Sequence, residues 1–180
     1  AFINLLAVLG WNDGTEQELY SMEELIENFS MDRVHAAGAK FDFEKAKWFN
    51  HEWIKKLPVT NYQARVKEIF ESKGIEIKDD IYFTKVLELV KERCPLLTDF
   101  FDQAVFFFVN PASYDEASVK PKWDSDKNDF FAELIKRYNR AADWNISSIE
   151  TEFKTLATEK NIKVGELQMI LRVMLVGTKM

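Results

Sequence analysis

The stretch that decides the fold is residues 41–54, which read Phe41-Asp42-Phe43-Glu44-Lys45-Ala46-Lys47-Trp48-Phe49-Asn50-His51-Glu52-Trp53-Ile54. Asp42 is suited to accept hydrogen bonds from the free amides at the start of a helix. After it, apolar side chains recur at helical spacing at Phe43, Ala46, Phe49 and Trp53. The stretch therefore predicts one helix that begins at residue 43 and reaches residue 54.

Helical spacing continues on both sides of this stretch. Before and after it, the sequence predicts helices at 2–9, from a capping box at Ser21 to about residue 29, from Ser30 to near Gly38, and from Asn61 to Ser72. Apolar residues at Phe83, Val86, Leu87 and Val90 are followed by a break at Pro95. Further helices are predicted at about 97–109, at 125–142, from a second capping box at Ser147, and after Gly165. Only residues 112–122 look like a true loop, and no strand-like alternation extends beyond 75–77. The fold class is all-α, with seams near residues 58–61 and 145–147.

Composition limits the class of protein. The chain has 180 residues, 47% of them apolar, and its fifteen Phe, five Trp and five Tyr exclude a disordered tail. No apolar run is long enough to span a membrane. One cysteine forbids an internal disulfide and suits a reducing cytosol, so we expect a cytoplasmic protein. Residues 1–9 read as a helix already in progress, so we expect the chain to be an excerpt of a longer protein.

Charge is distributed unevenly along the chain. Residues 1–32 hold seven acids and no base, residues 33–67 hold eight bases and three acids, and residues 99–133 hold eight acids and three bases. Tryptophans 48 and 53 lie among the lysines of the basic segment, a combination compatible with binding a polyanion. A solvated helix face explains the same pattern.

No catalytic constellation is present in the sequence. The six glycines form no phosphate-binding loop, and Cys94 has no histidine near it in sequence. One Cys and two His are too few for a Cys/His zinc site. We therefore expect no catalytic residue, no metal ligand and no cofactor in this chain.

Residues 41–54 resemble the F-D-x-x-K-L-x-W-x-N-x-x-Y-I signature of bacterial glutamyl-tRNA synthetases, with Ala46 and Trp53 as departures from it. Four further segments are similar to that family in the same order: residues 2–11, 19–26, 32–34 followed by Gly38, and 171–177. The resemblance implies a class I aminoacyl-tRNA synthetase that joins glutamate to its tRNA. ATP and Mg²⁺ would be held by a catalytic domain whose motifs this chain lacks.

The resemblance also implies a domain organisation. It predicts a helical stem-contact domain at 1–60, an anticodon-binding subdomain at 61–146, and a second, truncated anticodon-binding subdomain at 147–180. The partner would be glutamate tRNA, without DNA or a membrane, and the protein would be a monomer. The alternative is a helical protein–protein interaction module without catalytic activity, which the net negative charge and the many aromatic residues favour.

Residue roles follow from the matched positions. Lys45 and Trp48 match residues that touch the inside of the tRNA L near the D arm, where Lys45 suits a phosphate and Trp48 a ribose. Ordinary core packing remains the alternative for Trp48. Lys47 and Arg33 are candidates for further phosphate contacts, and a solvated face explains them equally well. The acidic segments 1–32 and 99–133 are expected to face away from the tRNA.

Arg93 matches the family arginine that reads the third anticodon base. Its guanidinium only donates hydrogen bonds, which suits the acceptors on the pairing edge of cytosine and not the donors of guanine. The alternative is a basic residue placed at a helix C-terminus by the helix dipole. Arg172 matches an anticodon-loop arginine in the last helix.

Overall fold

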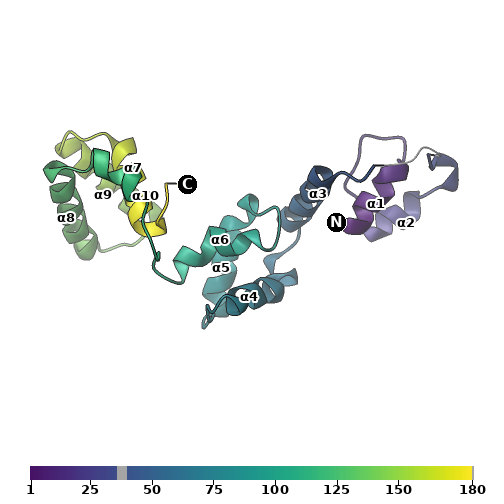
Figure 1. Ribbon diagram of the computed structural model, residues 1–180, viewed down its shortest axis with the longest axis horizontal. Helices are drawn as coiled ribbons and strands as arrows, with labels where there is room; N and C mark the ends of the chain where they lie inside the picture. The colour runs from purple at the N-terminus through teal and green to yellow at the C-terminus, as the bar shows by residue number, and fades with distance from the viewer. Residues whose placement is uncertain (36–39, 180) are drawn as a thin grey trace. The chain divides into compact units, whose positions relative to one another are not determined.

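The computed structural model describes residues 1–35 and 40–179, and the chain divides into two compact units, Ala1–Val109 and Asn110–Met180. The described residues form helices and no strand, which confirms the all-α prediction; one isolated bridge joins Trp11 to Val34. The first unit contains α1 (Phe2–Gly10), α2 (Met22–Asn28), η1 (Met31–Arg33), α3 (Phe43–Lys56), η2 (Val59–Asn61), α4 (Gln63–Ser72), α5 (Asp80–Val90), η3 (Lys91–Arg93), α6 (Asp99–Ala104) and η4 (Val105–Phe107) (Figure 1).

The second unit contains α7 (Glu116–Val119), η5 (Lys120–Lys122), α8 (Ser125–Arg140), α9 (Ile146–Glu159) and α10 (Val164–Val176). This division at residues 109/110 differs from the boundaries expected at 60/61 and 146/147. The three-part division describes functional domains rather than compact units, and it stays a prediction.

Helix α3 joins the two ends of the first unit. Asp42 caps it as expected, because its carboxylate accepts hydrogen bonds from the amides of Glu44 and Lys45. The Phe49 and Ile54 side chains are buried, and the helix contacts both α1 and η3. The helix that the sequence predicts at 43–54 is thus confirmed, with one more half-turn at its C-terminus.

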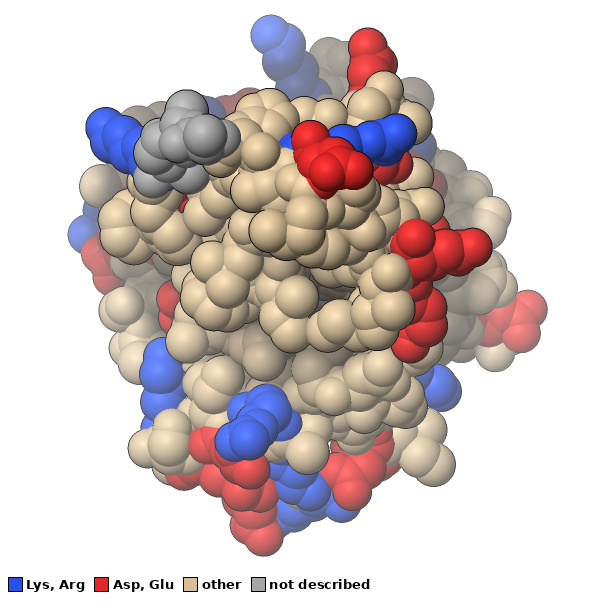
Figure 2. All heavy atoms as spheres, turned by 90° about the vertical axis from the view of Figure 1, so that its right-hand side faces the viewer, with Lys and Arg blue, Asp and Glu red and all other residues tan. Residues whose placement is uncertain are grey.

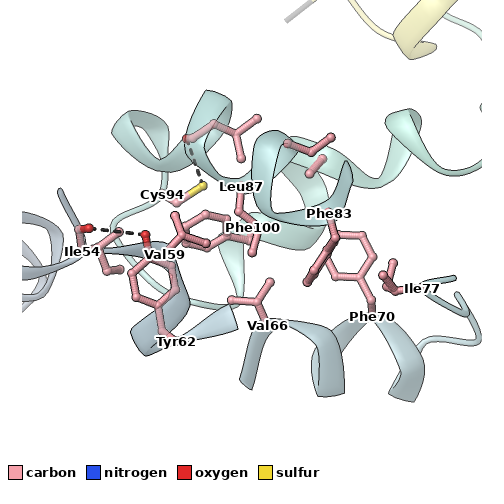
Figure 3. Packing of buried hydrophobic residues seen from close by; sticks show 13 residues of the cluster. Ile54, Val59, Tyr62, Val66, Phe70, Ile77, Phe83, Leu87, Cys94 and Phe100 are labelled. Carbon is pink, nitrogen blue, oxygen red and sulfur yellow. Dashed lines mark hydrogen bonds between the residues drawn. The ribbon is translucent and has the colours of Figure 1, made fainter. Parts of the chain in front are cut away.

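The main core of the first unit lies between η2, α4, α5 and α6 (Figure 3). Phe70 is fully buried at its centre, with ring centroids 5.4 Å from Phe83, 5.0 Å from Phe101 and 5.4 Å from Phe108. The contacts with Phe83 and Phe108 are edge-on and that with Phe101 is tilted, and aromatic contacts of this kind add to the free energy gained by burying the rings. Cys94, which directly follows η3, is buried in the same core, and its thiol donates to the Val90 carbonyl.

The second unit has its own core, built from α8, α9 and α10 around Phe130, Leu156 and Ile170. Gly177 ends α10 in the left-handed conformation, with φ of 87°. Its carbonyl accepts a hydrogen bond from the Asp115 amide at 2.8 Å, and a Cβ at this position would lie 2.7 Å from the Ser113 carbonyl oxygen. Glycine is therefore required here by both conformation and space.

Several local predictions were wrong. Asn61 does not cap α4, because the chain first makes the 3-10 turn η2 and Tyr62 precedes the helix. Asn145, not Ser147, caps α9 by accepting from the Ser148 amide. The expected loop at 112–122 contains α7 and η5. After Ser30 the chain forms only η1, and the helix end expected near Gly38 lies outside the described residues.

The face of the first unit that carries α1 and α2 is largely uncharged. Figure 2 shows this face, with uncharged atoms across its centre and acidic and basic side chains at its margins. The exposed apolar residues of these two helices are Phe2, Ile3, Leu6, Met22 and Ile26. The candidate tRNA-binding residues of the first unit lie on other elements, namely η1, α3 and η3.

Candidate nucleic-acid interface

Lys45 and Trp48 lie together on α3, as their spacing of three residues requires. The Lys45 Nζ atom is 4.6 Å from the centroid of the Trp48 ring, within the range of a cation–π interaction. The Trp48 ring also packs edge-on against buried Phe49, yet Trp48 remains 39% exposed. The ring thus packs partly against the core and stays partly exposed, and a contact between Trp48 and a ribose stays a prediction.

Lys45 already has an acidic partner. Its Nζ atom is 2.5 Å from Oε2 of Glu18, and the two side chains are 35% and 45% exposed. Glu18 belongs to the acidic segment 1–32, so one of its glutamates lies beside a candidate tRNA-binding lysine. That the segment as a whole faces away from the tRNA stays a prediction. A phosphate that binds Lys45 has to displace the Glu18 carboxylate or share the lysine with it.

Buried Asn4 explains why Glu18 lies beside α3. The Asn4 side-chain amide donates to the Glu18 carbonyl at 2.6 Å, and its oxygen accepts from the Tyr20 amide at 2.8 Å and from the Trp53 indole at 3.3 Å. One side chain on α1 thus ties the segment 18–20 to α3. A buried amide whose donor and acceptor are both used fixes such a segment strongly.

Lys47 and Arg33 are exposed and also have partners. Lys47 pairs with Glu44 one turn earlier on α3, with 2.9 Å between the charged atoms. The Arg33 guanidinium donates to the Asp13 carbonyl, which ties η1 to the loop that follows α1. Exposed pairs of this kind are weak, so they compete little with a phosphate.

Arg93 differs from the other candidates. It is the last residue of η3, it is exposed, and its side chain forms no hydrogen bond or ion pair with the residues at 1–35 and 40–179. The residues on either side of this turn, Val90 and Cys94, are buried in the core of the first unit. The guanidinium is therefore free to bind a ligand, while its backbone is anchored.

Arg172 lies in the second unit, on the exposed side of α10. Its guanidinium donates to the Lys179 carbonyl at 3.3 Å. This contact lies against the last described residues of the chain, and it gives Arg172 a structural role beside any role in binding.

Two residues of the candidate site were missed in the sequence. Asn50 and His51 on α3 donate hydrogen bonds to the carbonyls of Pro95 and Glu92, at 2.6 and 3.1 Å. They connect the helix of Lys45 to the turn of Arg93. Both belong to the stretch 41–54, but their partners lie more than forty residues further along the chain, so no local pattern could have shown the contact.

Two features of the described residues bear on possible chemistry, the state of the Cys94 thiol and the grouping of potential metal ligands. Burial raises the pKa of the Cys94 thiol to about 12, so the thiol is protonated at neutral pH and is a poor nucleophile. Within the described ranges, no three acidic, histidine or cysteine side chains are grouped so that they could hold a metal ion, and these residues do not fit a Mg²⁺ site. No helix in the described part of the chain is both long and apolar enough to cross a membrane.

Residues 43–180, which contain α3, η3 and the whole second unit, match the family described as anticodon binding domain. The chain belongs to this family. It corresponds to the C-terminal, anticodon-binding portion of bacterial glutamate–tRNA ligases, as the sequence resemblance predicted.

Individual relatives agree with this assignment. The chain is 42% identical over 178 residues to glutamate–tRNA ligase of Flavobacterium psychrophilum and 41% identical over 177 residues to that of Flavobacterium johnsoniae. A solved glutamate tRNA ligase from Elizabethkingia meningosepticum, in complex with its amino acid, has a TM-score of 0.88 and 33% identity over 98% of this chain. The chain spans 35% of the length of each of these proteins.

Proposed function

We propose that this chain binds glutamate tRNA and reads its anticodon for an enzyme that joins glutamate to that tRNA with ATP. The reaction, with ATP and Mg²⁺, belongs to the part of the relatives that this chain does not span, so the chain alone is inactive. We further propose that it acts as a monomer in the cytoplasm, as its family resemblance implies. The support is the match to the anticodon-binding family and the geometry of one arginine.

The observation that carries this proposal is Arg93. An exposed guanidinium without a partner among the described residues, on a turn packed against the core, is ready to donate hydrogen bonds to a ligand. Cytosine, the last anticodon base of glutamate tRNA, offers N3 and O2 as acceptors. Guanine, the last base for glutamine, offers N1–H and N2–H donors. Facing these donors would cost about 1–3 kcal/mol, enough to discriminate between the two tRNAs.

The basic residues of α3 supply affinity rather than base selectivity. Lys45 and Lys47 suit phosphates on the inside of the tRNA L, Trp48 offers its free face to a ribose, and Arg33 can add a contact from η1. In the second unit, Arg172 is proposed to contact the anticodon loop. Because these contacts are mainly to phosphates, binding should weaken steeply as salt rises.

The test compares binding of the 180-residue chain to two RNA hairpins that differ only in the third anticodon base, C or G. Arg93→Gln should lower the preference for C about tenfold if 1.4 kcal/mol is lost, because an amide both donates and accepts. Lys45→Ala should weaken two full-length tRNAs with these third anticodon bases about equally, because its contact lies near the D arm and carries no base information. Arg65→Gln is the matched control, since it removes the same charge from an exposed position on α4.

Three results would count against the proposal. If neither hairpin binds at high micromolar protein in low salt, the tRNA-binding function is wrong. If affinity does not change between about 50 and 200 mM salt, phosphates are not the main contacts. If Arg93→Gln weakens both hairpins and leaves their ratio unchanged, Arg93 does not read the base.

A further inference from the structure

The turn that carries Arg93 has two backbone carbonyls whose usual helical donors are used elsewhere. In a continuing helix, the amide of Leu96 would bond to the Glu92 carbonyl and the amide of Asp99 to the Pro95 carbonyl. Here the Leu96 amide donates to the Asp99 carboxylate at 2.8 Å, and the Asp99 amide donates to the Leu96 carbonyl at 3.1 Å. The cause is Pro95, which lacks an amide hydrogen and disfavours helix at the residue before it.

Side chains of α3 take the place of these donors. His51 donates through Nε2 to the Glu92 carbonyl at 3.1 Å, and Asn50 donates through Nδ2 to the Pro95 carbonyl at 2.6 Å. The two carbonyls flank Arg93 on either side along the chain. Adjacent residues of one helix therefore hold both ends of the segment from which the Arg93 side chain projects.

We propose that Asn50 and His51 are positioning residues for Arg93: they fix the backbone at residues 92–95 so that the guanidinium meets the third anticodon base in one orientation. The inference rests on the proposed function of Arg93. Discrimination between two bases requires hydrogen bonds of defined geometry, because a donor that can swing finds an acceptor on either base. Affinity for phosphates has no such requirement.

The chemistry of the two contacts suggests how to separate positioning from simple support of the fold. Glutamine at position 51 keeps a side-chain N–H donor, whereas leucine removes it. Aspartate at position 50 has the shape of asparagine but presents an oxygen to the Pro95 carbonyl. Both residues are only partly buried, so these single substitutions leave the core intact.

The experiment measures binding of the 180-residue chain to the same two hairpins, with C or G as the third anticodon base. His51→Leu and Asn50→Asp should each lower the C-over-G preference about threefold, mainly through weaker binding of the C hairpin, and His51→Gln should retain the preference. In an Arg93→Gln background, His51→Leu should have no further effect on the ratio, because the side chain it positions is absent.

The outcomes separate this inference from the proposed function. If Arg93→Gln lowers the preference but His51→Leu and Asn50→Asp do not, the positioning role is wrong and the function of Arg93 stands. If His51→Leu lowers the ratio equally with and without Arg93, it acts independently of the arginine, and the inference is also overturned. If Arg93→Gln leaves the ratio unchanged, the proposed reading of the anticodon fails and the inference fails with it.

Discussion

Glu18→Gln should strengthen RNA binding. The substitution keeps the size and hydrogen-bonding capacity of the side chain but removes the charge that holds Lys45 at 2.5 Å. In the wild-type chain, a phosphate at Lys45 must compete with this carboxylate and is also repelled by it. Removal of the carboxylate leaves the lysine available to the RNA.

The size of the effect follows from the exposure of the pair. Lys45 is 35% exposed and Glu18 45% exposed, so solvent screens their attraction, and such pairs typically contribute about 0.2–1 kcal/mol. If the whole of that free energy is released for RNA binding, the dissociation constant falls between about 1.4-fold and 5-fold, since 1.4 kcal/mol corresponds to a factor of ten. The gain should shrink as salt rises.

The assay is a titration of a fluorescently labelled full-length tRNA with the protein, followed by anisotropy, at low and at physiological salt. The tRNA carries C or G as its third anticodon base. Glu16→Gln is the matched control: it removes the same charge two residues away, from a glutamate that forms no ion pair within the described part of the chain. If Glu18→Gln binds no better than Glu16→Gln, Lys45 is not a phosphate contact and our view of α3 as a tRNA-binding helix is wrong.

Three further predictions test the fold. Phe70→Ala should lower the free energy of unfolding in urea by about 3–5 kcal/mol, because it empties the centre of the main core, and a loss below about 1 kcal/mol would contradict the packing described. Gly177→Ala should lower the melting temperature, because the glycine has a positive φ and lies close to the Ser113 carbonyl. Gly165→Ala should raise the melting temperature slightly, because Gly165 lies in a helix with open space around its Cα. Equal effects of the two substitutions would refute the argument. Burial raises the pKa of Cys94 from 9.0 to about 12, so the folded state keeps the thiol proton to a higher pH than the unfolded state does. The contribution of the buried, protonated thiol to the free energy of unfolding is therefore full below pH 9 and is lost as pH rises toward 12. Denaturation of Cys94→Ala should show a smaller loss over that window, and an identical loss would contradict the assignment.

Local signals carried most of the helix prediction. Asp42 and the Ser21–Glu24 capping box were identified correctly because a cap and its amides lie within three residues of each other. Asn61 and Ser147 do not cap these helices, because α4 begins after Tyr62, one residue later, and α9 begins after Asn145, two residues earlier. Burial of Val59 and Tyr62 sets where α4 can begin, and burial depends on residues far along the chain.

The candidate site was only partly predictable for the same reason. The positions of Lys45 and Trp48 on one helix follow from spacing, and the structure confirms the helix. The pairing of Lys45 with Glu18 joins residues 27 apart, and the contacts of Asn50 and His51 join residues 45 and 41 apart. Such contacts depend on how helices pack, and one sequence without its fold contains no direct sign of them.

The length of helix α3 fixes the distance and the angle between Lys45 and Trp48 near its start and the residues that contact the turn of Arg93. Each residue of an α-helix adds about 1.5 Å of length and about 100° of rotation. One residue inserted between Trp48 and Asn50 would therefore turn Lys45 and Trp48 by about 100° relative to the residues that contact η3. During evolution, the length of α3 between these positions could therefore not change by a single residue without moving one set of contacts away from the other.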